Sequence, residues 1–317
     1  MPSISNLRAP DKYLTNFSLQ VAQDINAFNV LDVIPTINVE QQSGLYRIFE
    51  AETLRKVQVR PVASGAQTTA GDFGYGKGQY NCQLRGLHVD IDPALRVNAT
   101  DINIERDTTS FLVSQMALEK TTRFVDTFFA DGVWGETLKG GTGFKQFDDT
   151  TSDPIRVITD AMFRQQLASG FKPNTMWISR RVFNDLLQHP EIVDRINRGQ
   201  TSGPAIANAE TLAAIFGLNK VIVIEAIVKD ENDNNAMIGD NKILLAYVNA
   251  NAGTQSATAM AHINWVGLGR YMTLGQSIIK MNHPLVDGVT RLEIKYADHL
   301  VVTAPSLGVL LTDVMSK

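Results

Sequence analysis

The pattern of apolar and polar residues predicts one long amphipathic helix over residues 107–130. With about 100° between successive residues, one side of this helix is apolar, and it comprises Val113, Ala117, Phe124 and Phe128 with Phe111, Leu118, Val125 and Phe129 beside them. The opposite side carries Gln115, Glu119, Arg123 and Asp126, of which Glu119 and Arg123 form a favourable i,i+4 pair. We expect Gly132 to end the helix. At roughly six turns it is about twice the usual length, which is typical of a scaffold element.

Residues 39–92 predict a long bent hairpin, with strands over 45–49 and 57–62. Residues 63–78 are small, polar and rich in glycine, so they predict a flexible tip. The apolar phase then changes along the returning strand, which predicts a β-bulge at Gly86: Tyr80, Cys82 and Leu84 precede the change, and Leu87, Val89 and Ile91 follow it. A two-stranded ribbon with no helix to cover it is marginal in water. We therefore expect a neighbouring copy of the chain to supply the missing surface.

The second half of the chain predicts an α/β domain around a central sheet. Nearly continuous apolar runs at 221–228 and 243–248 are typical of strands buried on both faces. A further strand is expected at 175–178, and helices follow cap or proline signals at 154–169, 180–188 and 210–216. Later strands are expected at 290–296, 300–303 and 308–311. The first of these alternates, with Leu292, Ile294 and Tyr296 inward, and we expect it to join a sheet beside the long helix.

Composition and charge restrict the classes of function. The chain has 317 residues, of which 44% are hydrophobic and 20% charged, so it can bury a sizeable core. A net charge of −4 without any Lys/Arg run argues against a dedicated nucleic-acid binder. Cys82 is the single cysteine, which excludes an internal disulfide and suits a reducing compartment. No apolar run approaches the length of about 20 residues that spans a bilayer.

Candidate chemical motifs are weak. Residues 71–78 resemble a phosphate-binding loop but lack Gly-Lys-Ser/Thr, and residues 230–241 resemble a calcium loop but have Asn235 and Asn241 where glycine and glutamate are needed. Asp90 and Asp92 share one face of a strand without a predicted pocket. The five histidines are dispersed, without metal-ligand spacing. We therefore predict no catalytic, cofactor-binding or metal site, and interpret the aromatics Phe73 and Tyr75 at the hairpin tip as contact residues.

The order of these parts resembles the major capsid proteins of tailed bacteriophages, which have the Hong Kong 97-type fold. The shared order is an N-terminal arm, an extended hairpin called the E-loop, a long spine helix, a compact axial domain and a return strand to a peripheral domain. Two local segments are also similar, namely Val33-Ile-Pro-Thr-Ile-Asn-Val39 before the E-loop and Lys172-Pro-Asn-Thr-Met-Trp-Ile-Ser179 at the start of the axial domain. The resemblance implies an α+β fold and covers nearly the whole chain.

The resemblance also implies a domain plan. Residues 1–38 would be the N-terminal arm and 39–92 the E-loop hairpin. Residues 93–153 and 272–303 would form the peripheral domain, with the spine helix at 107–130. The axial domain would take residues 154–271 and 304–317. Residues expected to contact other subunits are Phe73, Tyr75, Lys77, Arg60, Tyr46 and Phe17.

The implied function is structural. Many copies would assemble as pentamers and hexamers into an icosahedral shell around double-stranded DNA, contacted loosely and without sequence specificity. The protein would be made in the cytoplasm of the host bacterium and reside in the virion capsid, without a membrane. Because Val33-Ile-Pro35 comes early, no N-terminal scaffolding segment fits this sequence; either a separate scaffold protein is used, or such a segment is absent from the given sequence. A portal and a decoration protein are further expected partners.

Two alternatives remain at the level of sequence. An encapsulin-like compartment shares the fold but holds a protein cargo. An enzyme with an α/β domain and a swapped hairpin would need a perturbed acid or base in a pocket, and we find no candidate group. Lys77 lies in the loop where some members of the family form a covalent crosslink, but no neighbourhood for its partner is recognisable.

Overall fold

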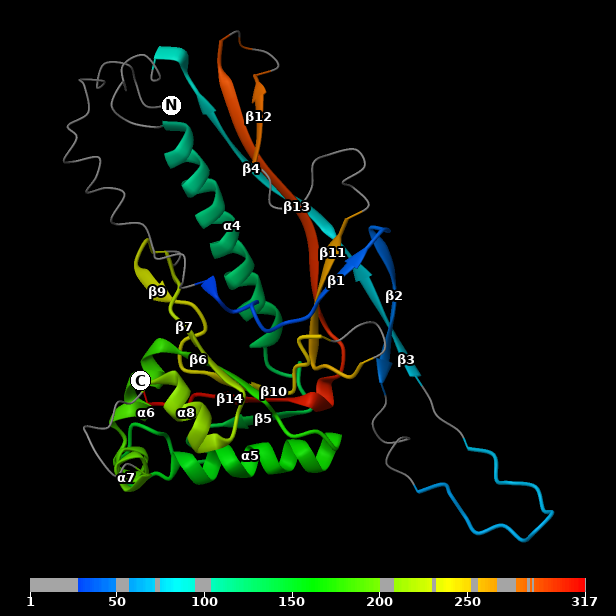
Figure 1. Cartoon of the computed structure of the whole chain (residues 1–317). Helices are drawn as coiled ribbons and strands as arrows, with labels where there is room; N and C mark the ends of the chain where they lie inside the picture. Colours follow the sequence, from blue (N-terminus) through cyan, green and yellow to red (C-terminus); the bar gives the residue numbers. More distant parts are fainter. Residues whose placement is uncertain are drawn as a thin grey trace.

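The structure is a computed structural model that describes residues 28–49, 57–71, 75–94, 104–199, 208–229, 232–251, 256–266, 278–283, 286 and 288–316. It contains a compact sheet layered with helices, a second sheet of longer strands beside one long helix, and a hairpin that projects away from the body (Figure 1). The predicted α+β character is confirmed. Of the predicted N-terminal arm over residues 1–38, residues 1–27 lie outside the described residues.

The compact sheet has the strand order β5-β14-β10-β6-β7. Its strands are β5 (Glu136–Lys139), β14 (Gly308–Thr312), β10 (Ile243–Ala246), β6 (Thr175–Ser179) and β7 (Lys220–Ile224). Every residue of β6, β10 and β14 is buried, which confirms strands covered on both faces. The predicted strand at 221–228 is divided, because the chain leaves the sheet after Ile224 and forms a small hairpin of β8 (Ile227–Lys229) and β9 (Asn235–Met237).

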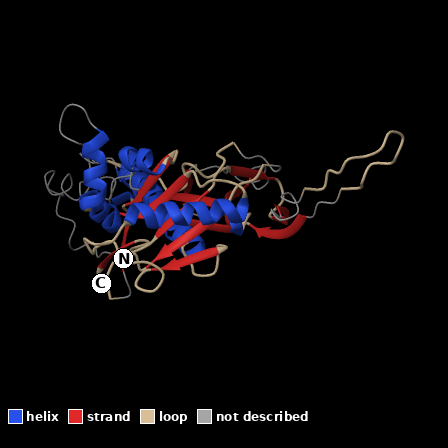
Figure 2. Cartoon of the chain, turned by 90° about the horizontal axis from the view of Figure 1, so that it is seen from below, coloured by secondary structure: helices blue, strands red, loops and turns tan. Residues whose placement is uncertain are grey.

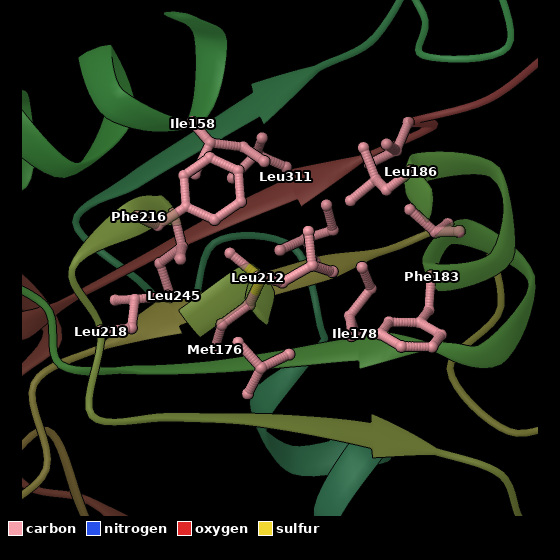
Figure 3. Packing of buried hydrophobic residues seen from close by; sticks show 14 of the residues in the cluster. Ile158, Met176, Ile178, Phe183, Leu186, Leu212, Phe216, Leu218, Leu245 and Leu311 are labelled. Atoms are coloured by element: carbon pink, nitrogen blue, oxygen red, sulfur yellow. The ribbon is translucent and has the colours of Figure 1, made fainter. Parts of the chain in front are cut away.

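One face of the compact sheet is covered by four helices. They are α5 (Pro154–Ser169), α6 (Arg180–Gln188), α7 (Pro190–Gly199) and α8 (Ala209–Phe216). Asp153 caps α5 by accepting from the backbone N–H of Arg156 at 2.9 Å, and Gly170 ends it in the left-handed region at φ 81°, as the sequence predicts. Figure 3 shows the core between these helices and the strands, where Ile158, Phe183 and Phe216 point at Met176, Ile178 and Leu245.

The other face of the compact sheet packs on the end of the long helix α4 (Ile104–Phe128). Phe124 and Phe128 are fully buried there, and the Phe124 ring lies 5.8 Å from that of Trp177 on β6. The Trp177 indole N–H also donates to the Val30 carbonyl at 3.0 Å. This second core fixes the compact sheet to the helix and to the N-terminal segment.

The second sheet, which we call the long sheet, lies along α4. Its order is β1 (Thr36–Val39), β11 (Met260–Trp265), β13 (Thr290–Val302) and β12 (Ile278–Asn282), and β4 (Gln83–Ile91) also pairs with β13. Strand β13 unites the two strands that the sequence predicts at 290–296 and 300–303. Leu292, Ile294 and Tyr296 are buried toward α4, as predicted.

The predicted bulge at Gly86 is wrong. Strand β4 pairs with β13 one residue to one from Gln83 to Ile91, and Gly86 lies opposite Lys295. A Cβ at Gly86 would lie 2.9 Å from the Ile294 carbonyl oxygen, so glycine is needed here for close approach of the two strands. The interruption occurs at Cys82 instead, between β3 (Tyr75–Asn81) and β4.

The hairpin proper consists of β2 (Ser43–Phe49) paired antiparallel with β3. Two tyrosines lie opposite glycines across the hairpin, with Tyr46 facing Gly78 and Tyr80 facing Gly44, and each ring occupies the space that a side chain on the glycine would need. Residues 57–62, predicted as a strand, belong to no strand. We call residues 57–71 the arm; in Figure 1 it lies at the lower right, away from the body.

Sheet pairing crosses three of the predicted domain boundaries. Strand β4, predicted within the E-loop, belongs to the long sheet, because it pairs with β13 along its whole length. Strand β11, predicted within the axial domain, also pairs with β13. Strand β5, predicted within the peripheral domain, pairs with β14 in the compact sheet. Such pairings join segments far apart in sequence, which a reading in chain order does not reveal.

Candidate assembly surfaces

The root of the hairpin, which we define by Tyr46, Asn81 and Cys82, is held against the body of its own chain. The Tyr46 hydroxyl donates to the Val302 carbonyl at 3.0 Å, and the Asn81 N–H donates to His299 Nδ1 at 3.2 Å. Cys82 is completely buried in a small cluster with Ala261, Ile263, Ala297 and Val301. The sequence led us to expect that a neighbouring copy of the chain covers the hairpin. This expectation is wrong for the base of the hairpin, which is covered by the outer face of the long sheet.

Burial at this root changes the acidity of two groups. It raises the pKa of the Tyr46 hydroxyl. It also raises the pKa of the Cys82 thiol to about 11, with the negative charge of Asp298 as a second cause. A thiol is reactive only as the thiolate, so Cys82 is a packing residue at neutral pH.

The arm is in the opposite situation. Val57 and Val59 are 87% and 89% exposed, and a turn closed by the Ala66 N–H donating to the Ala63 carbonyl lies near its middle. Large apolar side chains this exposed on one short segment are typical of a contact surface.

The predicted contact residues are distributed unevenly. Arg60 in the arm and Lys77 on β3 are exposed. Tyr46 is half-buried and serves the root of its own hairpin. Tyr75 begins β3, while Phe73 and Phe17 lie outside the described residues.

A buried ion cluster at Asp298 holds the hairpin side of the molecule to the helix. Asp298 is 2% exposed and accepts two hydrogen bonds from the Arg123 guanidinium, at 2.7 and 2.9 Å. His262 Nε2 lies 2.8 Å from the second carboxylate oxygen. Burial by itself raises the pKa of Asp298, but the hydrogen bonds from His262 and Arg123 outweigh burial and hold that pKa well below its usual range.

Glu119 extends the cluster toward strand β4. It forms ion pairs with Arg123 at 3.1 Å and with Arg85 at 3.0 Å, and accepts from the Tyr296 hydroxyl at 2.7 Å. The pair of Glu119 with Arg123 is thus confirmed; although both were predicted opposite the apolar side of the helix, the Arg123 side chain is only 15% exposed, whereas Glu119 remains 37% exposed. The missed signal is Asp298, which continues the inward phase of Leu292, Ile294 and Tyr296 and therefore requires a buried cationic partner.

This cluster superficially resembles a hydroxyl–imidazole–carboxylate triad, because Thr36 Oγ1 lies 3.4 Å from His262 Nδ1. A catalytic carboxylate serves to orient the imidazole and stabilise its cation. Here Arg123 already neutralises Asp298 through two hydrogen bonds. The geometry therefore favours a structural tie between α4, β11 and β13.

A cavity of about 330 Å³ borders this cluster, between residues 28–36, α4 and the long sheet. Its lining includes Lys120, His262, Asn264 and Asp298. The Lys120 ammonium lies 4.9 Å above the Tyr296 ring, and burial lowers the pKa of that ammonium. Charges of both signs line the cavity, so its lining does not define one class of ligand.

The other chemical motifs have structural roles. Asp90 forms a bidentate pair with Arg291 at 2.7 and 2.9 Å, and Asp92 accepts from the Ala94 N–H at 2.7 Å. The described part of the calcium-like segment, residues 232–241, includes strand β9 and has Asp233 in the left-handed region. Within the described ranges, no three His, Cys, Asp or Glu side chains are grouped to hold a metal ion. Nor does any helix in those ranges have the length and apolar character to cross a membrane.

The structure thus combines a compact sheet layered with helices, a long helix and a hairpin with an exposed arm. The family model described as phage major capsid protein E matches residues 130–273. A major capsid protein of Burkholderia phage BcepMu is 25% identical over 303 residues, covering 92% of this chain and 90% of the relative.

Solved structures show the same fold. A phage-related protein from Bordetella bronchiseptica superposes with a TM-score of 0.70 at 16% identity, covering 98% of this chain and 99% of that one. The capsid of cyanophage P-SCSP1u gives 0.57 at 11% identity over 90% and 87%. An encapsulin from Synechococcus elongatus gives 0.56 at 11% identity over 97% and 91%.

The fold is therefore of the Hong Kong 97 type. With the family match and the phage relative, the resemblance to the major capsid proteins of tailed bacteriophages is confirmed.

Proposed function

We propose that many copies of this chain assemble as pentamers and hexamers into the icosahedral shell that encloses the double-stranded DNA of a tailed phage. In this proposal α5–α8 and the compact sheet form the axial domain, and α4 with the long sheet forms the peripheral domain. The observation that carries the proposal is the exposed arm, because an apolar extended segment without a partner strand requires another molecule. We assign Arg60 and Lys77 as the charged residues of the hairpin that contact the neighbouring copy.

The net charge of −4 supports loose contact with the packaged DNA. A strongly cationic wall would bind phosphates in a salt-dependent manner and hinder movement of the genome. We further propose synthesis in the cytoplasm of the host bacterium, and a separate scaffold protein, a portal and a decoration protein as partners.

The test replaces residues 57–71 with a short Gly/Ser linker and compares the variant with the parent by size-exclusion chromatography and electron microscopy. We expect folded, unassembled chains from the variant and closed particles from the parent. Closed particles of normal size from the variant would contradict the assigned role of the arm.

The contents of the particles separate the phage shell from an encapsulin-like compartment. Particles purified from infected cells should contain nuclease-protected DNA. A co-purifying enzyme in place of DNA would favour the compartment, which the shared fold alone leaves open.

A further inference from the structure

Helix α5 carries an exposed apolar stripe on the side that faces away from the compact sheet. Phe163 and Leu167 lie one above the other at i and i+4 and are 64% and 71% exposed. Phe171 follows directly after the helix and stacks on Tyr247 with 4.9 Å between the ring centroids. We call Phe163, Leu167 and Phe171 the α5 stripe. Figure 2, viewed from below, shows α5 in front of the sheet, with the arm extending to the side.

The surroundings of this stripe resemble the rim of a protein interface. Arg164 pairs with Glu136 at 3.0 Å, and Arg156 lies 3.8 Å from Asp160. An apolar centre with charged groups of both signs around it is the usual anatomy of such a surface. The charges are mixed, which favours a partner that is largely apolar.

The arm has the complementary character. Val57 and Val59 point to one side of an extended segment because residues two apart share a face, and Arg60 is the only charged residue between 57 and 71. Pro61 restricts Arg60 to extended conformations, which keeps the chain extended directly after the two valines. The arm thus offers a short apolar ridge followed by one cation.

The spacing of the two surfaces also matches. Two residues of extended chain advance about 6.6 Å, and four residues of helix advance about 6 Å. Val57 and Val59 are therefore spaced to rest against successive side chains of the stripe, while Arg60 is able to reach Asp160, whose pairing with Arg156 is long and exposed.

We propose that the arm of one copy lies along the α5 stripe of a second copy in the assembled shell. This inference rests on the proposed function and names the surface that receives the arm. The occupant is a second copy because the arm extends away from the α5 helix of its own chain in both views. Since the two patches differ, the contact is heterologous and repeats around a ring.

The test is disulfide trapping in assembled particles. In the double variant Val59→Cys/Leu167→Cys, each chain carries one cysteine on each proposed surface. Mild oxidation should give a ladder of covalent oligomers on a non-reducing gel, because a disulfide requires Cα atoms within about 7 Å. Mixing chains that carry only one of the two substitutions before assembly should give dimers alone.

The matched control is Val59→Cys/Gln166→Cys, since Gln166 is exposed on the same helix but about 100° away from Leu167. It should give much less crosslinking. Equal yields from both pairs, or intact particles without crosslinks, would overturn the proposed contact and leave the capsid function standing. Dimers from Leu167→Cys alone would show that the stripe pairs with itself, which also overturns it.

A second measurement covers variants that fail to assemble. A photoreactive benzoyl-phenylalanine in place of Phe163 keeps an aromatic ring at that position. After irradiation of particles, mass spectrometry should identify a crosslinked peptide containing residues 57–62. A crosslink to any other segment, or to a different protein, would overturn the proposal. Absence of any particle from the unmodified chain would instead count against the proposed function.

Discussion

The compact sheet and the arm differ in how their backbone groups are paired and in how far their side chains are buried. The compact sheet places consecutive strand residues in two cores, so that Met176 faces the helices α5–α8 and its neighbour Trp177 faces α4. The arm belongs to no strand and exposes its valines. Extended backbone that lacks a ladder must be paired with water or with another chain. The compact sheet is thus complete within one copy, whereas the exposed valines of the arm are free to contact another copy in the proposed assembly.

The hairpin root lies between these two extremes. Among the described strands, β2 and β3 pair only with each other, but Tyr46, Asn81 and Cys82 attach the root to the long sheet. The root therefore directs the arm away from the body. A projecting element that is rigid at its base loses less conformational entropy on docking than a free one.

We expect the largest loss of stability from a change in the Asp298 cluster, where α4, the long sheet and the hairpin root meet. The substitution Asp298→Ala leaves the buried Arg123 guanidinium without its carboxylate, and we expect a loss of about 3–5 kcal/mol in the free energy of unfolding. Urea denaturation of the unassembled chain measures it. The control Asp160→Ala removes an exposed carboxylate with a long ion pair and should cost at most about 1 kcal/mol. Similar losses in both variants would show that the cluster has no special role.

The next effect compares the two regions directly. The substitution Leu245→Ala removes a fully buried side chain from the compact sheet. We expect it to lower the free energy of unfolding by about 2–5 kcal/mol. Val59→Ala in the arm should change the free energy of unfolding by less than about 0.5 kcal/mol but reduce the yield of particles. Thermal unfolding and electron microscopy of the same preparations separate folding from assembly. A large loss of stability from Val59→Ala would show that the arm packs on its own chain.

The smallest effect is a pH dependence at the hairpin root. Burial lowers the pKa of His299, and Arg123 and Arg85 lower it further while Asp298 opposes them. An imidazole held neutral contributes stability that is complete above the unfolded pKa of about 6.5 and lost as the pH falls through the lower folded pKa. Protonated Nδ1 is also unable to accept from the Asn81 N–H.

We therefore expect the Asn81 amide to exchange hydrogen faster in mild acid than at neutral pH, after correction for intrinsic chemistry. The Cys82 amide is an internal control, because it donates to the Gln42 carbonyl at 2.8 Å, which does not titrate. Equal changes at both amides would show a general opening of the hairpin without a role for His299.

Local pattern predicted most of the elements. The helix signal at 107–130 appears as α4, displaced by two to three residues, because apolar periodicity identifies a helix better than its ends. The inward face of β13 was also predictable, since strict alternation specifies which residues are buried. Asp298 continues this alternation, but the predicted strand ended at residue 296, and local pattern does not identify the partners Arg123 and His262.

By itself, the sequence determined the long helix, the strands buried on both faces and the hairpin, because these follow from periods of two and 3.6 residues and from caps. Only the tertiary structure decided that β4 and β11 join β13, that Gly86 accommodates a close strand instead of a bulge, and that Arg123 lies largely buried beside Asp298. The physical reason is that strand pairing and buried charge depend on contacts between segments far apart in the chain, and no local period records which segments meet.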